Sequence, residues 1–138
     1  MEIKSNKATK NRPEGDRVLD APYVFANLGD CIQLLRDEKF PQANDRKGIT
    51  IFKSDEVTIV LSGFLTGAVM DNVAVNGYMC LQVVEGSATI KTPDGDRELG
   101  AGGMVIFHPG VQHSIRGIEN CILLLTHYNA GKERNGII

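Results

Sequence analysis

The chain has 138 residues and a mass of 15.0 kDa, which is the size of one globular domain. Hydrophobic residues make up 42% and charged residues 23% of it, a composition typical of a folded core. The 15 lysines and arginines against 17 aspartates and glutamates give a net charge of -2, which argues against nucleic acid as a partner. The longest unbroken apolar run, Cys121 to Leu125, is far shorter than the ~20 residues of a membrane-spanning helix. We therefore expect a soluble protein without a nucleic-acid or membrane partner.

The cysteines and the first residues predict a cytoplasmic location. Cys31, Cys80 and Cys121 form neither a C-x-x-C pair nor a zinc-ligand spacing. An odd number of cysteines in a domain large enough to fold without disulfides is typical of reduced thiols. Residues 1–17 are polar and charged, and they contain no apolar segment of the kind found in secretory signals.

The first part of the chain predicts an arm followed by one short helix. Residues 1–22 show no apolar period, which is typical of a flexible arm. Over residues 23–38, apolar side chains recur near helical spacing. Asn27 or Asp30 could cap this helix, which we expect to end before Pro41 and to lay its apolar stripe on the rest of the domain.

After Gly48 the pattern predicts one short strand after another. The expected strands lie within residues 49–52, 57–61, 64–69, 73–86, 88–90, 104–108, 112–116 and 121–128. Turn residues such as Pro93-Asp94-Gly95-Asp96 separate them. Many short strands at regular spacing predict an all-β sandwich or barrel and not a parallel α/β sheet. The expected fold class is therefore all-β with a short N-terminal helix.

The longest of these predicted strands has one apolar face. The odd-numbered apolar positions are Val73, Val75, Met79, Leu81 and Val83. We expect this stripe to line the interior, where each fully buried apolar side chain contributes ~1.5–3 kcal/mol. The even positions Tyr78, Cys80 and Gln82 would then face another sheet or a second subunit.

Two segments framed by glycines, residues 67–86 and 102–117, show a motif spacing in addition to the pattern of β-strands. The residues that stand at motif spacing are Gly67 and Gly86 in the first segment and Gly102, Gly110 and His113 in the second. This pair of segments resembles the two motifs of the cupins, in particular small RmlC-like cupins of the conserved-barrel type. The resemblance implies a double-stranded β-helix, the cupin jelly-roll barrel, over residues 23–130, with a tail at 131–138. It also implies a homodimer.

The resemblance further indicates where cupins hold a metal ion. Two histidines and a glutamate of the first motif, with the histidine of the second, bind one divalent metal in the family. Those four positions are Val73, Val75, Met79 and His113 in this chain. Valine offers no donor atom, and a thioether suits soft metals better than hard ions. We therefore expect no metal cofactor, and a ligand pocket formed by Val73, Val75, Met79, Leu81 and His113.

His113 is the candidate catalytic residue, and two interpretations of it are open. In the functional interpretation, it acts as a general acid or base or anchors a polar atom of a ligand. In the structural interpretation, its ring nitrogens are satisfied by hydrogen bonds to backbone or water. A pair with Asp71 would resemble the acid–histidine dyads of metal-free cupin epimerases. His108 lies beside a turn and is expected at the rim or surface. His127 alternates with leucines of the last strand and could face the same cavity.

Three functions remain open at this point. The first is binding of a small molecule in an apolar barrel without the usual metal. The second is a metal-dependent dioxygenase, isomerase or decarboxylase with a rearranged site that includes His113. Its missing donors would come from His108, His127, Asp71 or Gln82. The third is a dimeric regulatory or structural module, with the even face of the long strand as the interface or the N-terminal helix exchanged between subunits. The fold supports too many chemistries to name a substrate.

Overall fold

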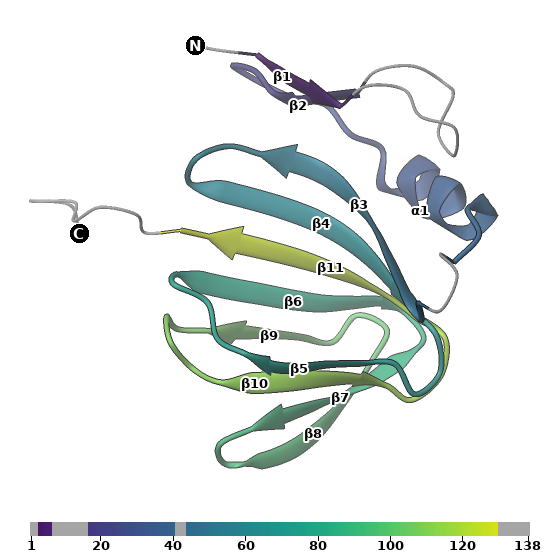
Figure 1. The fold of residues 1–138 in the computed structure, drawn as a ribbon, viewed down its shortest axis with the longest axis vertical. Coiled ribbons are helices and arrows are strands. Elements are labelled where there is room, and N and C mark those ends of the chain that lie inside the picture. The colour runs from purple at the N-terminus through teal and green to yellow at the C-terminus, as the bar shows by residue number, and fades with distance from the viewer. Residues whose placement is uncertain (1–2, 7–16, 41–43, 130–138) are drawn as a thin grey trace, which may run out of the picture.

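The computed structural model describes residues 3–6, 17–40 and 44–129. Two antiparallel sheets face each other and form a barrel (Figure 1), which confirms the predicted all-β class. The five-stranded sheet contains, in spatial order, β3 (Arg46–Lys53), β4 (Val57–Phe64), β11 (Cys121–Tyr128), β6 (Tyr78–Glu85) and β9 (Met104–Phe107). The four-stranded sheet contains β5 (Val69–Val73), β10 (His113–Gly117), β7 (Ser87–Thr92) and β8 (Gly95–Gly100).

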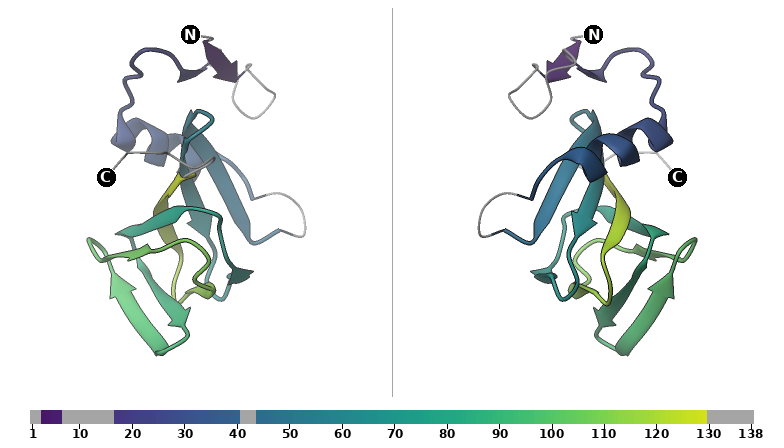
Figure 2. Two further views of the ribbon diagram at one scale, coloured as in Figure 1. Left: turned by 90° about the vertical axis from the view of Figure 1, so that its left-hand side faces the viewer. Right: turned by 90° about the vertical axis from the view of Figure 1, so that its right-hand side faces the viewer.

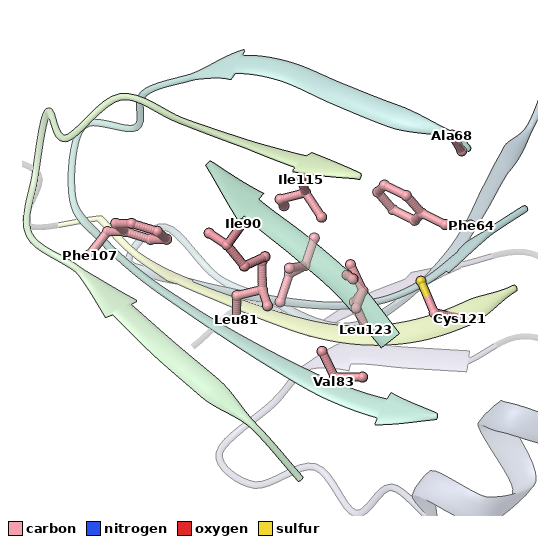
Figure 3. Packing of buried hydrophobic residues seen from close by; sticks show 11 residues of the cluster. Phe64, Ala68, Leu81, Val83, Ile90, Phe107, Ile115, Cys121 and Leu123 are labelled. Carbon is pink, nitrogen blue, oxygen red and sulfur yellow. The ribbon is translucent and has the colours of Figure 1, made fainter. Parts of the chain in front are cut away.

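The main hydrophobic core lies inside the barrel, between the two sheets. Leu81 and Leu123 from one sheet, and Ile90 and Ile115 from the other, are at most 1% exposed. Figure 3 shows these side chains and the ring of Phe107 directed into one shared space. Because successive residues of a strand point to opposite faces, alternate residues of strands such as β6 and β11 contribute to this interior.

The apolar stripe predicted on one long strand is divided between two strands. Val73 ends β5 in the four-stranded sheet, whereas Met79 lies on β6 in the five-stranded sheet. The prediction of one strand over residues 73–86 is therefore wrong. Between these strands the chain passes Gly77, where a Cβ atom would lie 2.1 Å from the carbonyl oxygen of Tyr128. This close backbone approach leaves no space for a side chain at the crossing between the sheets.

The predicted helix is confirmed as α1 (Leu28–Asp37). The side-chain oxygen of Asn27 caps it by accepting a hydrogen bond of 2.9 Å from the backbone N–H of Asp30. Leu35 of this helix is 1% exposed. It belongs to a second buried cluster on the outer face of the five-stranded sheet, with Ile49, Leu61 and Ile122. Figure 2 shows the helix lying along the outside of the barrel, where it contacts β3 and β4.

The described part of residues 1–22, predicted to be an arm, contains two short strands. β1 (Lys4–Asn6) and β2 (Arg17–Asp20) pair antiparallel and lie beyond the barrel, next to β3 (Figure 1). The guanidinium of Arg17 donates a 2.7 Å hydrogen bond to the carbonyl oxygen of Thr50 on β3. Pairing and this long-range bond are contacts that the polar composition of the segment does not indicate. The predicted tail at 131–138 lies outside the described residues.

Within the described parts of the chain, no helix combines the length and the apolar character that crossing a membrane would require.

Gly86 connects β6 to β7 and so joins the two sheets. Its φ is +76°, a conformation that glycine adopts without strain, and a Cβ there would lie 2.4 Å from the carbonyl oxygen of Asn120. Gly67, at the other end of the same motif, has a φ of +83° but open space around the Cβ position. Both glycines are required by backbone conformation, and Gly86 also by a close backbone approach.

Candidate functional site

His113 is a buried polar residue on the inner wall of the barrel. It begins β10, lies opposite Val73 of β5, and is 3% exposed. Its ring stacks on the ring of Phe107, with the centroids 4.0 Å apart and the planes 7° from parallel. The four-stranded sheet therefore supplies the imidazole, and the five-stranded sheet supplies the aromatic ring that covers one of its faces.

The two ring nitrogens of His113 have different environments. Nδ1 lies 3.0 Å from the backbone carbonyl oxygen of Val111. A carbonyl oxygen only accepts, so Nδ1 carries the hydrogen and donates it. Nε2 is buried and has no hydrogen-bond partner among the described residues. The imidazole is thus oriented by one nitrogen and leaves the other available.

His127 supplies a second imidazole, which is half-buried and comes from the facing five-stranded sheet. It alternates with the buried Leu125 along β11 and lies opposite Met79 of β6. Its Nε2 atom is also buried, and no described residue forms a hydrogen bond with it. Met79 lies opposite Phe107 on its other side. His127, Met79, Phe107 and His113 therefore follow one another around one end of the barrel.

Two other residues predicted for the site lie away from this interior. Asp71 is exposed and accepts a 2.6 Å hydrogen bond from the hydroxyl of Ser114, on the outside of the four-stranded sheet. The structure therefore does not bring its carboxylate to the buried ring of His113. His108 is exposed, as expected from its turn, and its ring lies 4.9 Å from that of Tyr78.

The cysteines and Gln82 do not contribute to the interior site either. Gln82 and Cys80 are half-buried on the outward-facing positions of β6. Cys121 is 3% exposed, and burial raises the pKa of its thiol to about 11, so little thiolate forms near neutral pH. Burial also raises the pKa of the Cys31 thiol. All three cysteines are free.

Phe107 is the site residue that sequence reasoning missed. It stacks on His113, although the two belong to different sheets. A sequence signal for it exists, because it shares an inward face with Val105 and directly precedes the turn that leads to His113. The alternation predicts that Phe107 points into the barrel, but it does not predict that the ring of Phe107 stacks on His113.

Charged side chains line a hollow on the outside of the barrel. A hollow of about 590 Å³ on the outer face of the four-stranded sheet is lined by Asp71, Lys91, Asp96 and Arg116, among others. Its charges are mixed in sign, and these four side chains are exposed. This hollow is separated from His113 by the sheet itself.

No family model matches the chain, and a search of curated proteins finds no match. Solved structures do match it. A cupin superfamily protein from Desulfitobacterium hafniense superposes with a TM-score of 0.63 and 18% identity, over 80% of this chain and 94% of that one. An RmlC-like cupin from Shewanella frigidimarina gives a TM-score of 0.61 and 22% identity, over 67% of this chain and 84% of that one. An RmlC-like cupin with a double-stranded β-helix fold from Methanocaldococcus jannaschii gives a TM-score of 0.56 and 17% identity. That superposition covers 66% of this chain and 87% of the other.

The chain has the cupin fold. The resemblance seen in its two glycine-framed segments is therefore confirmed at the level of the fold, including the jelly-roll arrangement of the sheets. Identities of this size leave the reaction and the ligand open, because one fold hosts many functions.

The residues at the cupin metal positions do not fit a divalent ion. These positions hold Val73, Val75, Met79 and His113. The valines have no donor atom, and the thioether is a poor ligand for a hard ion, which leaves a single imidazole. Across residues 3–6, 17–40 and 44–129, no three His, Cys, Asp or Glu side chains converge as a metal centre would need.

Proposed function

We propose that the protein binds a small, largely apolar molecule inside the barrel, beside His113 and without a metal ion. One observation supports this proposal above the others: the buried Nε2 atom of His113 lacks a hydrogen-bond partner among the described residues. An unsatisfied buried polar atom costs about 1–3 kcal/mol, which a bound ligand would recover. Apolar side chains around a few polar atoms are also the usual lining of a small-molecule site.

The gradient of burial indicates where a ligand would enter. Leu81 is fully buried, whereas Met79, Val75 and Val73 are half-buried. The wall therefore becomes more accessible from Leu81 towards the end of the barrel that holds His113. Met79 has an unbranched, flexible side chain, so it can change rotamer to admit a ligand at low cost.

Methionine methyl groups give a direct test of binding at this end of the barrel. In protein labelled with 13C at the methionine methyls, we expect toluene and 4-methylphenol to shift the Met79 signal. Met104 is 50% exposed on the opposite face of its sheet, so its methyl signal should stay in place. Absence of any shift at Met79 with either probe would show that the barrel does not take such ligands.

A metal-dependent enzyme is the second candidate function. The buried Nε2 atoms of both His113 and His127 favour it, because a free imidazole nitrogen is a metal ligand. Elemental analysis of untagged protein purified without chelator, followed by titration with iron, manganese, nickel and zinc, separates the two candidates. We expect far less than one equivalent of any metal. One full equivalent, lost in His113→Gln, would establish the metal centre instead.

We also propose that the protein forms a homodimer through the outer face of the five-stranded sheet. Helix α1 covers the part of this face formed by β3 and β4. At the other end, Ile106 and Met104 on β9 are 57% and 50% exposed, and Tyr78 on β6 is 40% exposed. β9 is also the last strand of the sheet, so within the described part of the chain one of its edges has no neighbouring strand. A second copy of the chain would remove this apolar area from water.

A regulatory or structural role of such a dimer is the third candidate function.

Light scattering after size-exclusion chromatography tests the dimer. We expect a dimer for the unmodified chain and a monomer for Ile106→Lys, since a lysine in an edge strand opposes association. Thr89→Lys, on the other sheet, is the matched control and should remain dimeric. A monomer of the unmodified chain at micromolar concentration would contradict the proposal.

The cytoplasm is the compartment that we propose for this protein. Its three free thiols support a reducing environment.

A further inference from the structure

We propose that the ligand of the barrel is a neutral molecule whose apolar body carries a hydrogen-bond donor, an O–H or N–H group, directed at Nε2 of His113. This inference rests on the proposed function and narrows it to a chemical class. The class includes phenols, alcohols and N–H amides, and it excludes ethers, esters and carboxylates.

The first step of the argument is the tautomer of His113. The contact of 3.0 Å to the carbonyl oxygen of Val111 requires a hydrogen on Nδ1. A neutral imidazole carries only one N–H, so Nε2 holds a lone pair and can only accept. The parallel stack on Phe107, at 4.0 Å between centroids, restricts rotation of the ring. Backbone and aromatic contacts together therefore present a fixed acceptor to the interior.

The second step is the chemistry that such an acceptor selects. A ligand O–H or N–H satisfies Nε2, whereas an ether or ester oxygen would place one lone pair against another. A carboxylate would bring an ionic charge next to Phe107 and Val73, and transfer of a charge into apolar surroundings is costly. A neutral ligand with an O–H or N–H group donates a hydrogen bond to Nε2, and its apolar body fits the apolar surroundings.

The third step concerns water as the competing occupant. A buried water is held well only when it makes about two to four hydrogen bonds to polar groups. The residues placed next to His113 by stacking and pairing are Phe107 and Val73, and Met79 lies opposite Phe107. None of these side chains offers a strong hydrogen-bonding group. A water that contacts only these three side chains and Nε2 would therefore be weakly held, and a donor ligand would displace it readily.

The tautomer can be measured on the unmodified chain. Long-range 1H–15N correlation spectra at neutral pH distinguish protonated from unprotonated ring nitrogens, and His113→Gln assigns the His113 signals by their loss. We expect a protonated Nδ1 and an unprotonated Nε2. The opposite tautomer, or a ring protonated on both nitrogens, would overturn the inference.

Matched probes test the ligand class. 4-Methylphenol and 4-methylanisole differ only by a methyl group on the oxygen, and toluene lacks the oxygen. From shifts of the Met79 methyl signal, we expect 4-methylphenol to bind about tenfold more tightly than either of the others. The preference should vanish in His113→Phe and persist in His108→Phe, since the ring of His108 is exposed.

The outcomes separate the two proposals. Equal affinity for the three probes would overturn the donor requirement and leave the apolar binding function standing. A preference for 4-methylphenol that survives in His113→Phe would also overturn the inference, because another group would then accept the hydrogen bond. Absence of binding by all three probes would overturn the proposed function and the ligand class together.

Discussion

Replacing Gly86 with alanine is expected to destabilise the fold by about 3 kcal/mol. Two physical costs add at this position. A non-glycine residue at a φ of +76° is strained, and its Cβ would lie 2.4 Å from the carbonyl oxygen of Asn120. Because the contact is with backbone, no side-chain rotation relieves it. Urea unfolding followed by circular dichroism measures the loss in free energy of unfolding.

Gly67→Ala is the matched control for this prediction. Its φ of +83° is nearly the same, but the Cβ position has no atom within 4 Å. Its cost should be limited to backbone strain, about 1–2 kcal/mol. The difference between the two variants then measures the close approach between Gly86 and Asn120. Equal losses in both would show that this approach relaxes without cost.

Leu123→Ala is expected to lower the free energy of unfolding by about 2–5 kcal/mol. Leu123 is 0% exposed and lies between Val83 of β6 and Ser62 of β4. Its inward side chain belongs to the barrel core, so truncation leaves a cavity that the two facing sheets cannot easily close (Figure 3).

Ile118→Ala provides the comparison for Leu123→Ala. Ile118 is 39% exposed and follows the end of β10, so water already reaches part of its side chain. We expect a loss below about 1 kcal/mol. Similar losses for the two variants in urea unfolding would contradict the assignment of the core to the space between the sheets.

The proposed ligand class follows from the apolar residues near His113. Val73 lies opposite His113, and Met79 lies opposite Phe107, so apolar side chains occupy these two positions of the wall. These apolar side chains surround an imidazole whose Nδ1 bonds to Val111 and whose Nε2 has no hydrogen-bond partner among the described residues. A barrel of this kind favours neutral, apolar ligands, and the hydrogen bond at Nε2 distinguishes among them.

The fold class was predictable because its signals are local. Alternation of apolar and polar residues indicates a strand such as 121–128, and glycines at fixed spacing indicate turns. The helix was predictable for the same reason, since apolar spacing and the Asn27 cap act within a few residues. The motif spacing predicted His113 in the ligand pocket, and its burial on the inner wall is seen only in the structure.

Other features depended on contacts between distant segments. The sequence alone placed Val73 and Met79 on one strand, whereas the backbone approach of Gly77 to Tyr128 divides them between two sheets. Likewise, the pairing of β1 with β2 could not be inferred from a polar segment. Sheet membership and register are set by packing of the whole chain, and local periodicity does not contain that information.

The sequence by itself determined an all-β chain with one short helix and two glycine-framed segments, the second of which contains His113. Only the tertiary structure decided which nitrogen of His113 is free, because that depends on the carbonyl of Val111 and on the ring of Phe107. It also placed Asp71 on the outside, bonded to Ser114. The physical reason is the same in each case: a hydrogen bond or a ring stack depends on three-dimensional geometry, which residue types and their spacing do not specify.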